Sequence, residues 1–405
     1  MTKNIITTLA FMTAVTLGAQ AAAGQFTIKL PDVSIKGKPV KTDGRKNSGN
    51  DDTTRKNTGA GDKTPDGNVT YPAQRPTGTP VLMKNTLYIQ AITHNEYWKM
   101  PKERNYSSWV PKLRFSHFFD NGRKLNYTVE YFNPDGSAWY SEKLEQSSRI
   151  AGDRTVLFES PSPWGGVIDT KSTAAVGVFG FKITDDDSKE VLFQGKFKVG
   201  KFGTTYNPRE KHKAGFYVDH DWLMAFGRIG FHHSVSEIGG MPLLVSFWFK
   251  EPVEAAELEA RVFFKGNQIA TTANNGGGVG SFEERYADAA PAFAADKVWK
   301  RWQFQWTNFL VDSNGTFNRA NFPEAFFADK NPGEYTVKVY RAGAQVRELT
   351  FTVGADGKFV VPAYSSQVFM PYYRLLFPVK TAGAEKFNAN AYKTEAFYGN
   401  PLKGF

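Results

Sequence analysis

Cysteine is absent from the 405 residues of this chain, and histidine occurs only 6 times. Without cysteine the protein has no disulfide bonds, no thiolate zinc site, no iron–sulfur cluster and no thiol nucleophile. The sequence also lacks a phosphate-binding loop, a dinucleotide-binding fingerprint and a Gly-x-Ser-x-Gly nucleophile elbow. We therefore expect a protein that is not an enzyme and that binds no cofactor.

Long apolar runs are lacking after the first 23 residues, since no later stretch approaches the roughly 20 residues that cross a bilayer as a helix. Residues 1–23 have the pattern of a secretory signal peptide, with Lys3 at the start, a mostly apolar core from Ile5 to Leu17, and small residues before position 24. The competing interpretation is an uncleaved membrane anchor, which the threonines within the short core disfavour. We predict cleavage, no remaining transmembrane segment, and an exported protein in the periplasm, on the cell surface or secreted.

Apolar side chains are scarce in residues 24–80, and the stretch 41–52 has none. Such a segment cannot bury enough surface to offset its ordering entropy, so we predict a disordered basic spacer. The whole chain has 50 Lys and Arg against 40 Asp and Glu, a formal net charge of +10. This excess favours an anionic partner, such as an acidic glycan or an envelope surface. No nucleic-acid-binding motif is present, so no nucleic acid partner is expected.

From about residue 86 onward, short stretches of alternating apolar and polar residues end at turn residues, which is typical of β-strands. Leu113–Phe119 stops at Asp-Asn-Gly, Leu125–Phe132 runs into Asn-Pro-Asp-Gly, and Leu243–Phe249 continues the pattern. One segment differs: Phe322–Lys330 is predicted to form about two helical turns, with Asn321 as its N-cap.

An internal repeat runs through this strand-rich part of the chain. Residues 179–199 contain two alternating segments around a polar turn, and residues 335–353 repeat the same arrangement with a shorter turn. The repeat predicts two copies of one module, residues 86–202 and residues 215–356.

The two modules resemble immunoglobulin-like or fibronectin-type β-sandwiches of bacterial exported proteins. The segment Asn331-Pro-Gly-Glu-Tyr335, which leads into the last hairpin, is similar to the common closing pattern of such sandwiches. The resemblance covers most of residues 86–356. It implies an all-β fold with two tandem immunoglobulin-like modules, preceded by the disordered spacer and followed by an extended aromatic tail. Because this architecture hosts many functions, the resemblance implies no activity.

Residues 357–405 form that C-terminal tail, whose segment 368–378 is strongly apolar and aromatic. One interpretation is that the tail folds back and covers the surface of its own modules. The other is that it adds as a strand to a second copy of the chain or to another envelope protein. In the second case the tail would mediate self-association or binding of a protein partner.

Four of the six histidines fall between positions 212 and 233. Histidine together with carboxylates can hold a metal ion. The spacing, however, matches no helix-borne ligand pair, and a histidine that is packed under a tryptophan and hydrogen-bonded to an aspartate at a module junction explains the pattern better. No metal site is predicted, and the candidate ligands are Asp219, His220, Asp221, His232 and His233.

Aromatic residues are numerous, with 9 Trp, 17 Tyr and 34 Phe. On a strand, Trp302-Gln-Phe-Gln-Trp306 places its aromatic rings on one face and its glutamines on the other, which favours a buried core row. Trp139, Tyr140 and Trp164 are expected in loops, where aromatic rings are available to a ligand such as a sugar. We therefore select these three as candidate ligand-binding residues.

Taken together, these features predict an exported, non-catalytic binding or assembly protein of the cell envelope or extracellular space that acts through protein–protein contacts. The first alternative is a carbohydrate-binding protein that uses its loop tryptophans. The second alternative is a metal-dependent enzyme centred on the His/Asp cluster between the modules.

Overall fold

The computed structural model describes most of the chain from residue 81 onward, and these residues belong to one compact unit, Gly59–Phe405. The predicted signal peptide, the predicted spacer and the last 14 residues, 392–405, lie outside the described residues. The described ranges are 81–82, 86–101, 106–118, 125–150, 155–231, 241–250, 252–311, 324–360, 362, 374–383 and 385–391.

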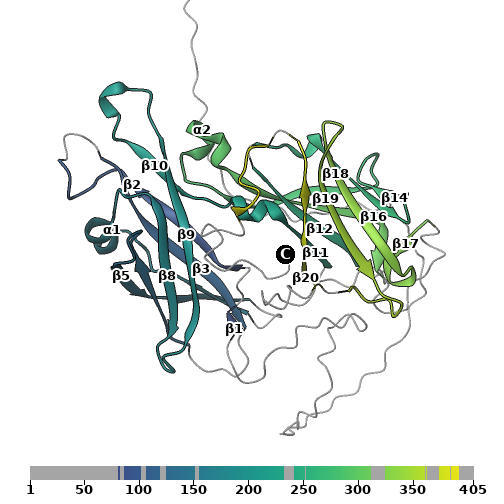
Figure 1. Ribbon diagram of the computed structural model, residues 1–405, viewed down its shortest axis with the longest axis horizontal. Coiled ribbons are helices and arrows are strands. Elements are labelled where there is room, and N and C mark those ends of the chain that lie inside the picture. The colour runs from purple at the N-terminus through teal and green to yellow at the C-terminus, as the bar shows by residue number, and fades with distance from the viewer. Residues whose placement is uncertain are drawn as a thin grey trace, which may run out of the picture. The chain divides into compact units, whose positions relative to one another are not determined.

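Two sheets form what we call the first module (Figure 1). Sheet A contains β1 (Val81–Leu82), β2 (Tyr88–His94), β3 (Ser108–Phe118), β6 (Glu145–Ile150) and β7 (Thr155–Glu159). Sheet B contains β4 (Tyr127–Phe132), β5 (Ala138–Lys143), β8 (Gly177–Asp185), β9 (Val191–Gly203) and β10 (Ala214–Val218). A short helix, α1 (Gly166–Lys171), lies between β7 and β8 in the chain.

Sheets A and B share one hydrophobic core. Sheet A contributes Trp109, Leu113 and Phe115 from β3 to this core, and sheet B contributes Phe179 and Phe181 from β8. Side chains alternate between the two faces of a strand, so one face of each sheet is buried here while the other remains on the outside. The first module is therefore a β-sandwich.

Two further sheets form the second module. Sheet C contains β11 (Phe226–Phe231), β12 (Met241–Lys250), β15 (Gly277–Arg285), β16 (Trp299–Val311), β17 (Phe326–Phe327) and β20 (Arg374–Pro378). Sheet D contains β13 (Leu258–Phe264), β14 (Asn267–Thr271), β18 (Gly333–Arg341), β19 (Ala344–Val353) and β21 (Lys380–Thr381). The short helices are η4 (Asp221–Ala225), α2 (Ala290–Phe293) and η8 (Ala328–Lys330).

The second module has a core of its own between sheets C and D. Trp302, Phe304 and Trp306 of β16 are buried in it, opposite Val337 and Val339 of β18. The expectation that the Trp-Gln-Phe-Gln-Trp row is a core row is therefore confirmed.

The two modules have the same strand order. In the first, sheet A runs β2-β3-β7-β6 and sheet B runs β9-β8-β4-β5; in the second, sheet C runs β11-β12-β16-β15 and sheet D runs β19-β18-β13-β14. Taken along the chain, this is the A-B-E-D and G-F-C-C′ arrangement of the immunoglobulin fold. The all-β class and the class-level resemblance to immunoglobulin-like modules are confirmed.

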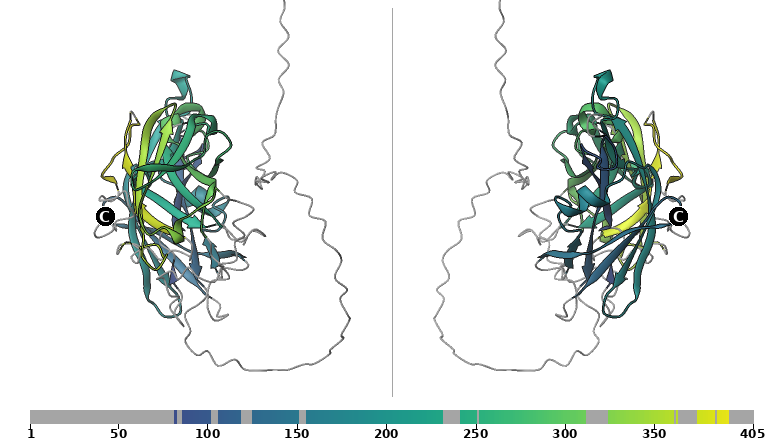
Figure 2. Two further views of the ribbon diagram at one scale, coloured as in Figure 1. Left: turned by 90° about the vertical axis from the view of Figure 1, so that its right-hand side faces the viewer. Right: turned by 90° about the vertical axis from the view of Figure 1, so that its left-hand side faces the viewer.

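The strands outside this common set close each module differently. In the first module β10 continues from β9 and pairs with it, and the Phe216 amide donates to Thr93 Oγ1 of β2 at 3.1 Å. In the second module the closing strands come from the C-terminal region: β20 pairs with β11 in sheet C, and β21 pairs with β19 in sheet D. Both side views in Figure 2 show this yellow segment along the strands of the second module.

The predicted helix at Phe322–Lys330 is wrong for its described part, residues 324–330. Phe326 and Phe327 form β17, which pairs in parallel with β16, and only the single turn η8 follows. The extended backbone places Phe326 against Phe264 and Tyr335, so tertiary packing overrides the local preference for a helix. Among the described residues, no helix has the length and apolar character needed to cross a membrane.

Candidate functional site

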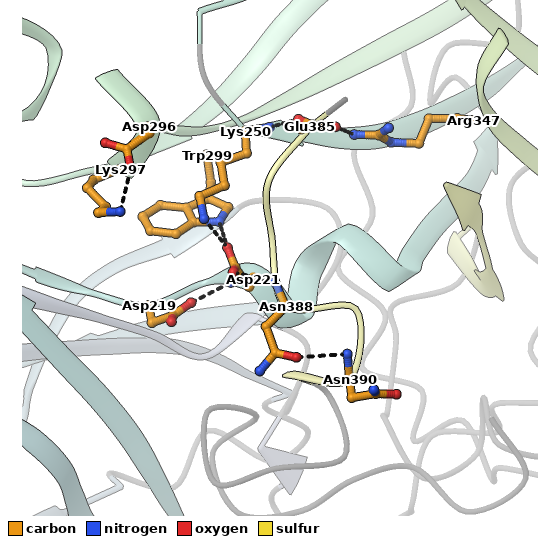
Figure 3. Close-up of polar contacts among 10 residues, drawn as sticks. All are labelled: Asp219, Asp221, Lys250, Asp296, Lys297, Trp299, Arg347, Glu385, Asn388 and Asn390. Atoms are coloured by element: carbon orange, nitrogen blue, oxygen red, sulfur yellow. Dashed lines mark hydrogen bonds and ion pairs between the residues drawn. The ribbon is translucent and has the colours of Figure 1, made fainter. Parts of the chain in front are cut away.

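Asp221, one of the candidate metal ligands, lies at the start of η4 between the two modules and is occupied by protein groups (Figure 3). Its Oδ1 lies 2.8 Å from Lys250 Nζ and accepts a hydrogen bond from Trp299 Nε1 at 3.0 Å. Its Oδ2 accepts a hydrogen bond from the Asn388 amide at 2.7 Å. Because both carboxylate oxygens have donors, Asp221 joins β12, β16 and the C-terminal segment instead of presenting a free ligand.

The neighbouring carboxylate, Asp219, stabilises the turn that holds Asp221. Its Oδ1 accepts a hydrogen bond from the Asp221 amide at 2.9 Å, which fixes the turn into η4. Burial, and next the charge of Asp221, raises the pKa of Asp219 above its ordinary value.

His220 is buried where the two modules meet. Its ring lies 5.6 Å from that of Tyr88 and meets the Trp299 ring edge-on at 5.5 Å. Burial, and next the positive charge of Arg285, lowers the pKa of His220 well below its ordinary value, so the ring is neutral at physiological pH. His220 Nδ1 has no hydrogen-bond partner among the described residues.

These contacts give the candidate metal ligands a structural role. Within the described ranges, no three His, Asp or Glu side chains come together in a group that could hold a metal ion. His232 and His233 lie outside the described residues. His212, farther up the chain, stacks on Tyr106 with ring centroids 4.1 Å apart.

A polar hollow of about 440 Å³ lies on the outer face of sheet A. Gln90 and Lys112, which are opposite each other in the β2–β3 ladder, line it from the sheet. Asp288, from the connection between β15 and α2 of the second module, also lines it, so both modules contribute to this hollow. The remaining lining residues are Ile92, Glu145, Glu159, Ser160, Ser162, Pro163 and Trp164.

Trp164 is 62% exposed at the edge of this hollow. Pro163 before it and Ile168 of α1 after it are buried, and the Ile168 amide donates to the Pro163 carbonyl at 3.0 Å. Gly165 has φ of 98°, a conformation that other residues adopt only with strain. These features fix the turn and leave the large indole ring facing solvent, in a T-shaped arrangement with the His94 ring at a centroid distance of 6.3 Å.

Hydrogen bonds of Ser160, one of the residues that line the hollow, hold its wall in place. Its hydroxyl oxygen accepts a hydrogen bond from the Leu113 amide at 2.9 Å and lies 3.4 Å from the hydroxyl of Tyr131. Tyr131 in turn donates to Glu142 Oε1 at 3.2 Å, and burial raises the pKa of Glu142 above its ordinary value. Hydrogen bonds to β3 and β4 therefore hold the wall of the hollow at Ser160 in place.

The other two candidate ligand-binding residues lie on a strand, so their expected place in a loop is wrong. Trp139 and Tyr140 belong to β5 and pack against the core of the first module. The Trp139 ring contacts Trp109 at 5.3 Å, and its Nε1 donates to the Lys171 carbonyl at 2.8 Å. Packing against the core explains both side chains.

Sequence reasoning selected Trp164 but missed the other residues that line the hollow. The local signal was a polar residue at some outward strand positions, as at Gln90 and Lys112. Asp288 could not have been selected, because it lies 124 positions beyond Trp164 in the chain and comes from the other module.

The structure thus has two β-sandwiches with the same strand order and a polar hollow on the outer face of the first. No family model matches this chain, and no curated protein matches it. Among solved structures the chain is similar to one described as "Biofilm associated protein - B domain", with 9% identity, 78% of this chain covered, 97% of that chain covered and a TM-score of 0.14. At that TM-score the similarity supports no conclusion about function.

Proposed function

We propose that this chain is an exported, non-catalytic binding protein and that the hollow beside Trp164 takes its ligand. The observation that supports this most is a large aromatic ring, 62% exposed, held at the edge of a formed polar hollow. Exposed tryptophans on rigid turns are typical of binding surfaces, because ordering a ligand against them costs little side-chain entropy.

A carbohydrate fits this hollow better than an apolar molecule. Small apolar ligands favour pockets lined mainly by hydrophobic side chains. Here most of the lining residues are polar, and Gln90, Ser162 and the carboxylates offer hydrogen bonds to hydroxyl groups. The face of Trp164 offers the apolar contact that a sugar ring needs. Glycan binding is therefore the first function to test.

The test compares two exposed tryptophans by retention on a panel of immobilised polysaccharides. Trp164→Ala should reduce retention on the bound glycan at least about tenfold, which corresponds to about 1.4 kcal/mol. Trp98→Ala is the matched control, because Trp98 is 56% exposed but does not line the hollow. Equal retention by the two variants would contradict the proposal, and so would shortening of the glycan during incubation, since that would indicate catalysis.

A protein-binding function is the second candidate, and a separate surface feature favours it. Tyr206 is 87% exposed, and its ring lies 5.5 Å from that of Phe293 in α2, which is also exposed. Paired exposed aromatic rings are enriched at protein interfaces. Light scattering over a concentration series, with Tyr206→Ala as the variant, tests self-association through this pair. A mass that stays monomeric at every concentration would count against it.

The C-terminal segment offers little support for assembly in its described part. Residues 374–381 pair with β11 and β19 of the same chain, and the Ala391 side chain lies in the core of the first module. These contacts favour the interpretation in which the tail folds back on its own modules. Export through residues 1–23 is tested by sequencing the N-terminus of the protein recovered outside the cytoplasm.

A further inference from the structure

The hollow beside Trp164 has a charge opposite to that of the whole chain. The formal net charge of the chain is +10, yet the hollow is lined by the carboxylates Glu145, Glu159 and Asp288 and by one cation, Lys112. At physiological ionic strength charges farther away than about 8 Å are largely screened. A ligand in the hollow therefore experiences the local negative charge rather than the positive charge of the whole chain.

Lys112 does not balance this charge. Its Nζ lies 3.9 Å from Glu159 Oε2, so it compensates one carboxylate of the set. Glu145 lies directly opposite Glu159 in the β6–β7 ladder, and like charges in such a cross-strand pair repel each other. Within the described residues neither Glu145 nor Asp288 has a cationic side chain in an ion pair with it. In the part of the chain that the structure describes, two carboxylates of the hollow thus have no ion-pair partner.

Trp164 adds a second, independent preference for a cation. The face of an indole ring attracts an ammonium group within about 6 Å, with a gain of roughly 0.5 to 2 kcal/mol. The ring is exposed at the edge of the hollow that the carboxylates line, so one bound group can contact both. Gln90 and Ser162 remain available to hydroxyl groups.

We propose that the ligand of this hollow is an amino-sugar glycan with free, protonated amino groups. This inference rests on the proposed glycan-binding function and adds the charge of the ligand to it. The ammonium group would pair with Glu145 and Asp288, and the sugar ring would lie against Trp164. The net charge of the chain predicted an anionic partner, so the local geometry reverses that expectation for this site.

Three hexasaccharides test the proposal by titration calorimetry on the purified chain, at a pH where the sugar amine is protonated. A glucosamine hexamer should bind at least about tenfold more tightly than an N-acetylglucosamine hexamer or a neutral glucose hexamer of the same length. Added salt should reduce this preference. The Glu145→Gln, Asp288→Asn double variant should bind the glucosamine and N-acetylglucosamine hexamers to within about twofold of each other.

The matched control removes the same charge elsewhere. Glu190→Gln with Glu334→Gln changes two exposed carboxylates that do not line the hollow, and it should keep the tenfold preference. Near-ultraviolet circular dichroism confirms that both double variants remain folded.

The possible results separate the two proposals. Equal or tighter binding of an uncharged hexamer would overturn the amino-sugar inference and leave glycan binding intact. No binding of any hexamer would overturn both. A lysine-rich peptide of equal charge that binds as tightly as the glucosamine hexamer would also overturn the inference, because the site would then select ammonium groups without the sugar.

Discussion

The two modules share eight strands in the same order, but they differ in how each is closed and in what lies on its outer face. The first module is closed by β10, which is the next strand after β9 in the chain. The second module is closed by β20 and β21, which come from the C-terminal region. The first module therefore has its closing strand in local sequence, whereas the second depends on a segment that returns from farther along the chain.

The outer faces of sheet A and sheet C also differ. On sheet C the outward residues Arg301 and Glu283 pair with each other, and Arg301 also donates to Ser246 Oγ at 3.2 Å. On sheet A the outward residues Gln90 and Lys112 line the hollow instead. Both outer faces therefore carry an ion pair, Arg301 with Glu283 on sheet C and Lys112 with Glu159 on sheet A, and on sheet A this pair lines a polar hollow.

The junction between the modules connects these differences. Arg285 of β15 lies over the Tyr88 ring of β2 at 4.7 Å and over Trp248 at 5.1 Å. Asp288, which lines the hollow, follows Arg285 by 3 positions. The contacts that join the modules therefore also place the residue that the second module contributes to the hollow.

Removal of residues 374–405 should produce the largest effect. The described part of this segment includes Leu375 and Phe377, which are buried in the core of the second module, and Leu376, which is buried in the core of the first; each is worth about 1.5 to 3 kcal/mol of burial. The loss is comparable to the total stability of a domain, about 5 to 15 kcal/mol. Hydrogen exchange should show protection lost first in β11 and β19 and retained longer in β3 and β8. Equal loss in both modules would contradict the difference in closure.

Asp221→Ala should have the next largest effect, because it leaves Lys250 buried without its counter-ion. Breaking a buried ion pair by removing one partner costs about 3 to 5 kcal/mol in the free energy of unfolding. Urea denaturation measures this loss. Lys380→Ala is the control: Lys380 pairs with Glu348 at 3.0 Å, but its side chain is exposed, so the expected loss is below about 1 kcal/mol. Similar losses in the two variants would mean that Asp221 does not hold the junction.

Much of the fold could be predicted from the sequence, because its signals are local. The alternation at Leu113–Phe119 and the repeated hairpins at 179–199 and 335–353 record which residues face a core. The helix predicted at Phe322–Lys330 failed because Phe326 is held by contacts with Phe264 and Tyr335, which no local pattern reveals.

The candidate site was harder to predict from the sequence, because it too depends on contacts between residues that are far apart in the chain. Trp164 was identifiable from its Pro-Ser-Pro-Trp-Gly-Gly loop, because proline and glycine punctuate turns. Trp139 has a similar composition around it yet packs on the core, since its position on β5 depends on pairing with β4. Asp221 was selected as a candidate metal ligand because it follows His220. Its ion-pair partner Lys250 lies 29 positions away, so the sequence could not reveal the pair.

The pH dependence of stability tests the burial of His220 at the junction between the modules, and we expect a smaller change in the free energy of unfolding here. The pKa of His220 is lowered in the folded protein, whereas the unfolded chain has the ordinary value of about 6.5. Below about pH 6.5 the histidine is protonated in the unfolded chain but stays neutral in the folded protein. The free energy of unfolding therefore decreases as the pH is lowered below about 6.5, by up to about 1.4 kcal/mol per pH unit. Arg285 and Glu283 face the ring, and Arg285 opposes its protonation.

The variant His220→Phe isolates this contribution. It retains a ring against Tyr88 and Trp299 but cannot take up a proton. The free energy of unfolding measured between pH 7 and pH 5 should decline less steeply in the variant than in the unaltered protein. The same slope in both would show that His220 is not the group that titrates.

Trp164→Ala should have the smallest effect on stability among these variants, although it should have the largest effect on glycan binding. Trp164 is mostly exposed, so Trp164→Ala should change the free energy of unfolding by no more than about 0.5 kcal/mol. Trp306→Ala in the core of the second module should cost about 3 to 5 kcal/mol, because it leaves a cavity in a packed interior. Urea denaturation of the two variants makes the comparison. A large loss of stability in Trp164→Ala would mean that the ring supports the turn before α1, and loss of glycan binding in that variant would then reflect a disordered hollow rather than a missing contact.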